Sequence, residues 1–67
     1  MDLMLDEALA TGIAAHKAGR IQEAGKFYTA IIQAEPTHPD ANHNFGLLFV
    51  GVGKIEEALT FFKVALT

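Results

Sequence analysis

The segment that decides the fold occurs twice in this 67-residue chain: residues 19–28 read GRIQEAGKFY, and residues 53–62 read GKIEEALTFF. The two copies lie 34 residues apart, and five of their ten positions are identical. The match extends towards the N-terminus, because Asp6 pairs with Asp40 and Gly12 with Gly46 at the same separation. A fixed period near 34 residues is typical of helix–turn–helix repeats, so we expect the chain to be two copies of one helical hairpin.

Start and stop signals divide each copy into two helices. Helices are expected over residues 3–18, 21–34, 39–52 and 55–67. Asp2 is expected to cap the first of them. Gly19 and Gly53 should end the first and third helices in the left-handed backbone conformation that glycine adopts easily. Pro36 cannot continue the second helix, and Pro39 suits the first position of the third.

The composition is that of a small chain with more apolar residues than its size can bury. Hydrophobic residues make up 51% of the chain and charged residues 19%, yet a chain of this length buries only about 60% of its unfolded surface. The net charge of -3 disfavours nucleic-acid binding, which requires a basic surface. No stretch approaches the roughly 18 apolar residues of a membrane span, and the acidic start lacks the basic region of a secretory signal. These features predict a soluble, cytoplasmic protein that binds neither nucleic acid nor membrane.

The repeated residues resemble the tetratricopeptide repeat (TPR) family, whose pattern runs W-x2-L-G-x2-Y, then A-x3-F, then P. The glycine is matched by Gly12 and Gly46, the alanine by Ala24 and Ala58, the aromatic residue after it by Tyr28 and Phe62, and the closing proline by Pro36. The resemblance covers almost the whole chain. It implies an all-α fold of four antiparallel helices in two hairpins, stacked as a right-handed α-solenoid. The domain would span residues 1–67, with repeat one at about 5–38 and repeat two at about 39–67, the latter incomplete at its C-terminal end.

The first repeat departs from the family pattern at its large positions. The tryptophan, leucine and tyrosine places hold Ala8, Thr11 and Ala15 in repeat one, and Asn42, Phe45 and Phe49 in repeat two. The first hairpin is therefore expected to pack less fully than the second.

In this family the first helix of each hairpin lines a concave face, so the resemblance implies a partner-binding groove. Its residues would be Leu9, Ile13, His16, Lys17, His43, Asn44, Leu47 and Val50. The four apolar members could bury the face of a partner's helix or a peptide. In a second interpretation of equal weight, Leu9 and Ile13 instead fill the thin core of the first hairpin, because a helical period identifies a face but not what covers it. Asn44 is expected either to bond a bound peptide or to serve as a solvated or capping side chain.

The final helix lacks the neighbour that a helical repeat normally has. Such repeats usually number three or more and end in a polar cap. Leu59, Phe62 and Leu66 are expected on the outer face of this helix, where they would form a self-association edge. The expected function is a protein-interaction module, with a protein or peptide as partner, that forms a homodimer through this edge or through the groove.

The residues give little support for catalysis or for a cofactor. The chain has no cysteine and no serine, so it lacks the common nucleophiles and thiolate ligands. His16, His38 and His43 are not spaced at i, i+4, the spacing that places two metal ligands on one helical face. We therefore expect no enzyme activity, no cofactor and no metal, and we expect His38 to face solvent in the connector between the repeats.

Two further functions stay open from the sequence. The runs at residues 18–24 and 38–44 resemble repeats that precede bacterial glycosyl-, sulfo- or methyltransferase domains. That resemblance implies a targeting or scaffolding segment whose catalytic domain lies outside this chain. The other possibility is an apolar ligand in the stripe formed by Leu9, Ile13, Leu47 and Val50.

Overall fold

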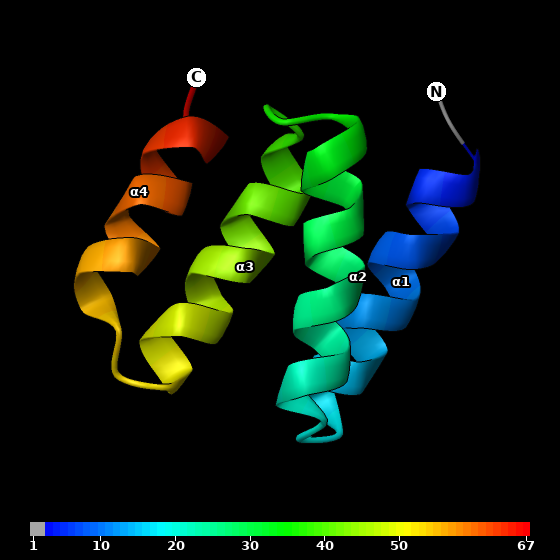
Figure 1. The fold of residues 1–67 in the computed structure, drawn as a ribbon, viewed down its shortest axis with the longest axis horizontal. Helices are drawn as coiled ribbons and strands as arrows, with labels where there is room; N and C mark the ends of the chain where they lie inside the picture. The colour runs from blue at the N-terminus through cyan, green and yellow to red at the C-terminus, as the bar shows by residue number, and fades with distance from the viewer. Residues whose placement is uncertain (1–2) are drawn as a thin grey trace.

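A computed structural model of the chain describes residues 3–67 and contains four helices and no strand in that range. The helices are α1 (Leu3–Lys17), α2 (Ile21–Ala34), α3 (Pro39–Gly51) and α4 (Ile55–Ala65). Consecutive helices run antiparallel, and α1 with α2 and α3 with α4 form closely packed hairpins (Figure 1). The expected all-α architecture of two helical hairpins is confirmed, although three of the helices end one or two residues earlier than expected. The expected cap, Asp2, lies outside the described residues.

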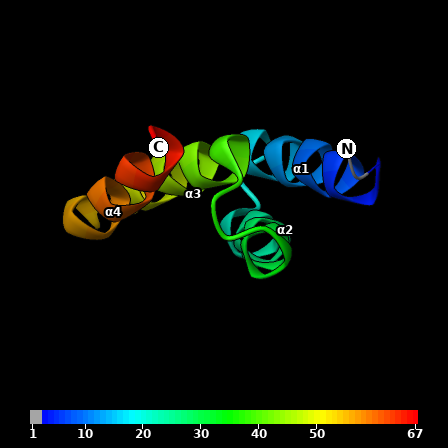
Figure 2. The ribbon, with the colours of Figure 1, turned by 90° about the horizontal axis from the view of Figure 1, so that it is seen from above.

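The second helix joins the two hairpins. It packs against α3, whereas α1 and α3 touch over a smaller area and α2 does not reach α4. Seen from above, α1, α3 and α4 follow one another in a shallow layer, and α2 lies beneath the junction of α1 and α3 (Figure 2). The result is a flat body of 31 × 29 × 14 Å. Within the described residues, α4 packs against α3 alone, so its other sides are open.

Both hairpins close with the same glycine turn. Gly19 has a φ of 81° and Gly53 a φ of 82°, in the left-handed region that other residues avoid. In each turn the residue after the glycine donates its N–H to the carbonyl oxygen five positions earlier, at 2.8 Å. This bond closes a helix end in the Schellman arrangement. The expectation that glycine ends the first and third helices is therefore confirmed.

A second glycine in each repeat allows the two helices of a hairpin to approach closely. A Cβ at Gly12 would lie 2.9 Å from Cε1 of Tyr28, and a Cβ at Gly46 would lie 2.6 Å from Cε1 of Phe62. Carbon atoms in favourable contact stand about 3.5–4.0 Å apart, so no other residue fits without displacing the ring. The two contacts are equivalent under the 34-residue shift, so both hairpins use the same close approach of glycine and ring.

The core is small and rich in alanine. The buried apolar residues are Ala15, Ala24, Tyr28, Ile31, Ala41, Leu48 and Ala58. Large apolar side chains are exposed at Met4, Leu47, Val50, Val52, Ile55, Leu59 and Leu66. Within the described residues, more large apolar side chains are therefore exposed than fully buried. Stability from this core alone is expected to be marginal.

Tyr28 is the centre of that core. It is fully buried, and its ring lies 5.9 Å from the ring of Phe45 on α3 and 6.2 Å from the ring of His16 on α1, measured between centroids. Aromatic pairs at these separations contribute beyond the area that they bury. One α2 side chain therefore contacts the other hairpin as well as its own.

The second hairpin has an aromatic cluster that the first lacks. The ring centroids of Phe45, Phe49 and Phe61 lie 4.7, 4.9 and 5.2 Å apart, and the rings of Phe49 and Phe61 are stacked. At the equivalent places of the first hairpin, Thr11 is exposed and Ala15 is buried. The two hairpins thus share a backbone plan but differ in how much apolar surface they bury.

The connector between the repeats is held by two polar side chains. Asn42 is 2% exposed, and its Nδ2 donates hydrogen bonds to the carbonyl oxygens of Pro36, at 3.1 Å, and His38, at 2.8 Å. Nδ1 of His38 accepts a hydrogen bond from the N–H of Ala41 at 3.1 Å and so caps α3. His38 is half-buried, which differs from the solvent-facing position expected for it, because capping turns its ring onto the helix end.

We predict that Gly46→Ala destabilises the protein while Gly25→Ala stabilises it. The new methyl group at position 46 would overlap the Phe62 ring, which should lower the free energy of unfolding by about 1–3 kcal/mol. A Cβ at Gly25 meets nothing within 4 Å, so alanine there should add roughly 0.4–1 kcal/mol by restricting the unfolded chain. Urea unfolding followed by circular dichroism measures both. Equal stability of Gly46→Ala and the wild type would refute the close contact.

Asn42→Ala is predicted to lower the free energy of unfolding by about 1–3 kcal/mol, because the carbonyl oxygen of Pro36 loses the amide donor of Asn42 and that of His38 keeps only the backbone N–H of residue 42. The matched control is Asn44→Ala on the same helix. Nδ2 of Asn44 bonds only the carbonyl oxygen of Asp40, at an exposed position, so this change should be close to neutral. The same unfolding curves compare the two variants. A larger loss at position 44 than at position 42 would contradict the role given to Asn42.

Candidate functional site

The apolar residues expected in the groove do not form one open surface. Leu9 and Ile13 are half-buried and pack against the core formed by Ala15, Ala24, Tyr28 and Leu48. Leu47 and Val50 are 43% and 42% exposed on α3. This arrangement agrees with the second interpretation of the sequence, in which the α1 stripe completes the first hairpin. The remaining open apolar surface of the groove is a pair of residues on one helix.

The polar residues expected in the groove are engaged locally or face solvent. Nδ1 of His16 lies 3.4 Å from the hydroxyl of Tyr28, at the long end of hydrogen bonding. Asn44 donates from Nδ2 to the carbonyl oxygen four residues earlier, at 2.8 Å, which is a bond within its own helix. Lys17 and His43 are exposed, and the ring of His43 lies beside that of Phe62. These side chains do not converge on a common point.

An open apolar surface runs along α4. Leu59 is 51% and Leu66 89% exposed, and Phe62 between them is half-buried against Gly46. The structure adds Ile55, 52% exposed, to the three residues expected from the sequence. Ile55, Leu59 and Phe62 lie on one face of α4, and Leu66, the residue that caps the C-terminal end of the helix, continues their spacing of i, i+4, i+7 at i+11. We call this surface the α4 edge and define it by Ile55, Leu59, Phe62 and Leu66.

The 34-residue repeat shows what is missing from the α4 edge. Ile21 on α2 is the equivalent of Ile55, and it is half-buried and packed against the core. Ile31 on α2 is fully buried, whereas its equivalent Ala65 on α4 is only half-buried. The helix α2 packs against both α1 and α3. In the described chain α4 has no neighbour in the equivalent place. The signal that identifies Ile55 was present in the sequence, as its match to Ile21.

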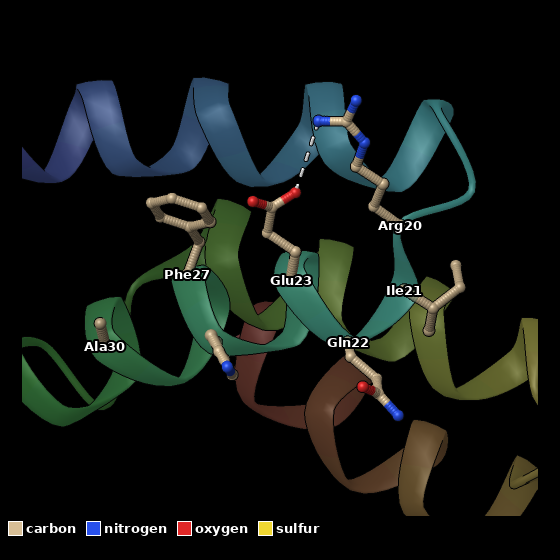
Figure 3. Close-up of a pocket in the computed structure, with 7 residues that line it drawn as sticks. Arg20, Ile21, Gln22, Glu23, Phe27 and Ala30 are labelled. Atoms are coloured by element: carbon tan, nitrogen blue, oxygen red, sulfur yellow. Dashed lines mark ion pairs between the residues drawn. The ribbon is translucent and has the colours of Figure 1, made fainter.

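Two hollows lie along α2, and neither is a closed pocket. One, of about 770 Å³, is lined by Arg20, Ile21, Gln22, Glu23, Lys26, Phe27 and Ala30. In Figure 3 the side chains of Glu23 and Phe27 project to one side of α2 and that of Gln22 to the other. The other hollow, of about 500 Å³, is lined by Gln22, Gly25, Lys26, Thr29, Ala30, Gln33 and Phe45. The helix α2 and its N-cap residue, Arg20, supply nearly all of the residues that line the two hollows. Ligand pockets, in contrast, are enclosed from several sides.

The charges at this flank of α2 do not form a strong binding site. Arg20 and Glu23 make an ion pair of 3.7 Å, drawn in Figure 3, with both side chains more than half exposed. Water screens such a pair, so its contribution is small. Across residues 3–67 no group of three or more histidine, aspartate or glutamate side chains is arranged to hold a metal ion. None of the helices in that range has the length and apolar character needed to cross a membrane.

The environment of Tyr28 changes the chemistry of its phenol. Desolvation by burial raises the pKa of the Tyr28 phenol above its ordinary value of 10.0. The hydroxyl is next to His16 within the core and lies outside the two hollows. Its role is therefore structural.

No protein-family model, curated protein or solved structure matches this chain.

We predict that Tyr28, the only tyrosine in the chain, ionises above pH 10.0 in the native protein and near pH 10.0 in denaturant. Because the folded pKa is raised, this group's contribution to stability is complete below the unfolded pKa and is lost as pH rises through the folded value. Phenolate absorbance during an alkaline titration measures the ionisation directly, since no other tyrosine and no tryptophan contributes. Tyr28→Phe is the control and should remove this alkaline loss of stability. A native midpoint at or below 10.0 would contradict burial of the phenol.

Proposed function

We propose that this chain is a TPR-like protein-interaction module that docks a partner helix on the α4 edge. The observation that carries the proposal is the equivalence of α2 and α4 under the 34-residue repeat. Ile21 on α2 is half-buried and packs against the core, whereas its equivalent Ile55 on α4 is 52% exposed, and α2 has α3 beside it as well as its hairpin partner α1 while α4 packs against α3 alone. The two glycine–aromatic contacts at equivalent places support the assignment of both hairpins to one repeat type.

The chemistry of the α4 edge favours an apolar helix as the partner. Its four positions share one helical face, and a facing helix buries such a stripe along its whole length. Full burial of one leucine or isoleucine contributes about 1.5–3 kcal/mol, so the exposed parts of Ile55, Leu59 and Leu66 contribute roughly 3–6 kcal/mol together. Association itself costs about 4–15 kcal/mol. The partner must therefore bring apolar side chains of its own, which a polar extended peptide does not.

The concave face on α1 and α3 is the weaker candidate. Leu47 and Val50 are exposed there, but Leu9 and Ile13 already contact the core. A helix docked on this face would bury two large apolar side chains of the module, compared with four on the α4 edge. The α4 edge is therefore the surface on which we place the partner.

A displayed library of amphipathic helices tests this function. Helices selected against the wild-type chain, at concentrations low enough to keep it monomeric, should lose about tenfold to a hundredfold in affinity for Leu59→Glu. Leu47→Glu is the matched control, because Leu47 is a leucine of similar exposure on the neighbouring helix. Circular dichroism establishes that both variants keep their helices. Selected helices that lose affinity for Leu47→Glu and keep it for Leu59→Glu would move the site to the concave face and overturn the proposal.

A further inference from the structure

We infer that the partner helix on the α4 edge is α4 of a second copy of this chain, paired antiparallel about a two-fold axis. This inference rests on the proposed function, since it uses the same surface and names its occupant. A two-fold interface uses one patch twice, so the patch must be complementary to itself. The pairing of the apolar positions, the charges beside them and the alternative ways to cover α4 decide whether the α4 edge meets that requirement.

The apolar positions of the α4 edge match each other in antiparallel register. When two α4 helices are aligned in opposite directions about their common centre, Ile55 faces Leu66 of the second copy and Leu59 faces its Phe62. Every apolar position then meets an apolar position, and the most exposed side chain of the set, Leu66 at 89%, gains a partner. Both copies contribute the same surface, so the apolar area buried is twice that contributed by one chain. This larger burial offsets the free-energy cost of association.

The charges beside the stripe are also complementary in this register. Glu56 and Lys63 are seven residues apart, so they lie on the same flank of the stripe, and both are exposed. Across residues 3–67 neither has an ion-pair partner. A two-fold axis perpendicular to both helices places each flank against the same flank of the second copy. Glu56 of each chain then faces Lys63 of the other, giving two ion pairs.

A parallel arrangement does not reproduce this match. Parallel packing places each flank opposite the other flank of the neighbouring helix. The other flank of α4 carries Ala58 and Ala65, which are small, uncharged and turned towards α3. Glu56 and Lys63 would then have no partners. The second helix would also lie towards the side of α4 on which the Phe62 ring already contacts Gly46 of α3. The charges therefore select the antiparallel pair.

A head-to-tail chain of copies is the other way to cover α4. In that arrangement α1 of the next copy would pack on α4 as α3 packs on α2. The positions of α1 equivalent to Ala41, Phe45 and Leu48 of α3 are Glu7, Thr11 and Ala14, all exposed. This face offers a charge and two small side chains where α3 offers a phenylalanine and a leucine. It is a poor complement to the α4 edge. Such a head-to-tail contact would also leave one α4 edge uncovered at the end of every row of copies.

The first test is the solution mass of the full chain from about 1 μM to about 1 mM, the range in which weak interfaces assemble. The expected result is a shift towards twice the 7.2 kDa chain mass by sedimentation or light scattering. Leu59→Glu should stay monomeric with unchanged helix content, and Leu47→Glu should dimerise like the wild type. A wild-type chain that is monomeric over the whole range overturns the inference, as does a dimer lost on Leu47→Glu and kept on Leu59→Glu.

Charge reversal tests the antiparallel register itself. Glu56→Lys and Lys63→Glu should each weaken the homodimer about tenfold, because both ion pairs become like-charge contacts. An equal mixture of the two variants should dimerise again, since both pairs across a mixed dimer are then opposite in sign. The doubly substituted chain, Glu56→Lys with Lys63→Glu, should dimerise like the wild type. A mixture no more dimeric than its separate components, or single variants as dimeric as the wild type, would rule out this register.

The two proposals fail in different ways. A monomeric wild type whose α4 edge still binds helices from the displayed library overturns the dimer and leaves the proposed function intact. A dimer that depends on Leu59 and follows the charge-reversal pattern supports both. If Leu47→Glu abolishes binding of the library helices, and the wild type and its charge-reversal variants are all monomeric, both proposals are overturned.

Discussion

The structure depends on the contact between a glycine of one helix and an aromatic ring of the next, made once in each hairpin. Because Gly12 has no Cβ, the ring of Tyr28 enters the first hairpin and from there contacts Phe45 of the second. Because Gly46 has none, Phe62 lies close against α3 in the same way. A side chain at either glycine would separate the helices, and the alanine-rich core is too small to compensate for that separation.

One repeated unit therefore occurs in two environments. In its first copy the second helix, α2, packs against both α1 and α3, and in its second copy the equivalent helix, α4, packs against α3 alone. A repeat cannot bury its own outer face and needs a neighbour to do so. Binding on the α4 edge would also stabilise the fold by mass action, because a partner that binds only the folded chain shifts the equilibrium towards it. In a molecule with so small a core, association and stability are expected to be coupled.

The candidate site could be predicted from the sequence in part. The outer face of the last helix was expected at Leu59, Phe62 and Leu66, because repeat logic identifies an unpartnered end, and the same logic applied to Ile21 would have added Ile55. The sequence could not predict which apolar residues of the expected groove would be buried and which would be exposed. Ile13 and Leu47 are equivalent under the 34-residue shift, yet Ile13 packs against the core whereas Leu47 is 43% exposed. A helical period gives a direction around the helix axis, and what lies in that direction depends on distant residues.

The sequence by itself determined the helices, their glycine and proline boundaries, the pairing into hairpins and the equivalence of Gly12 and Gly46. These depend on backbone conformation and on spacing along the chain, which the residues specify locally. Only the tertiary structure decided which apolar side chains are buried, that Asn42 and His38 hold the connector, and that Ile55 is exposed beside Leu59 in the α4 edge. Burial and capping require groups from separate segments to meet in space, and their meeting depends on how the hairpins pack.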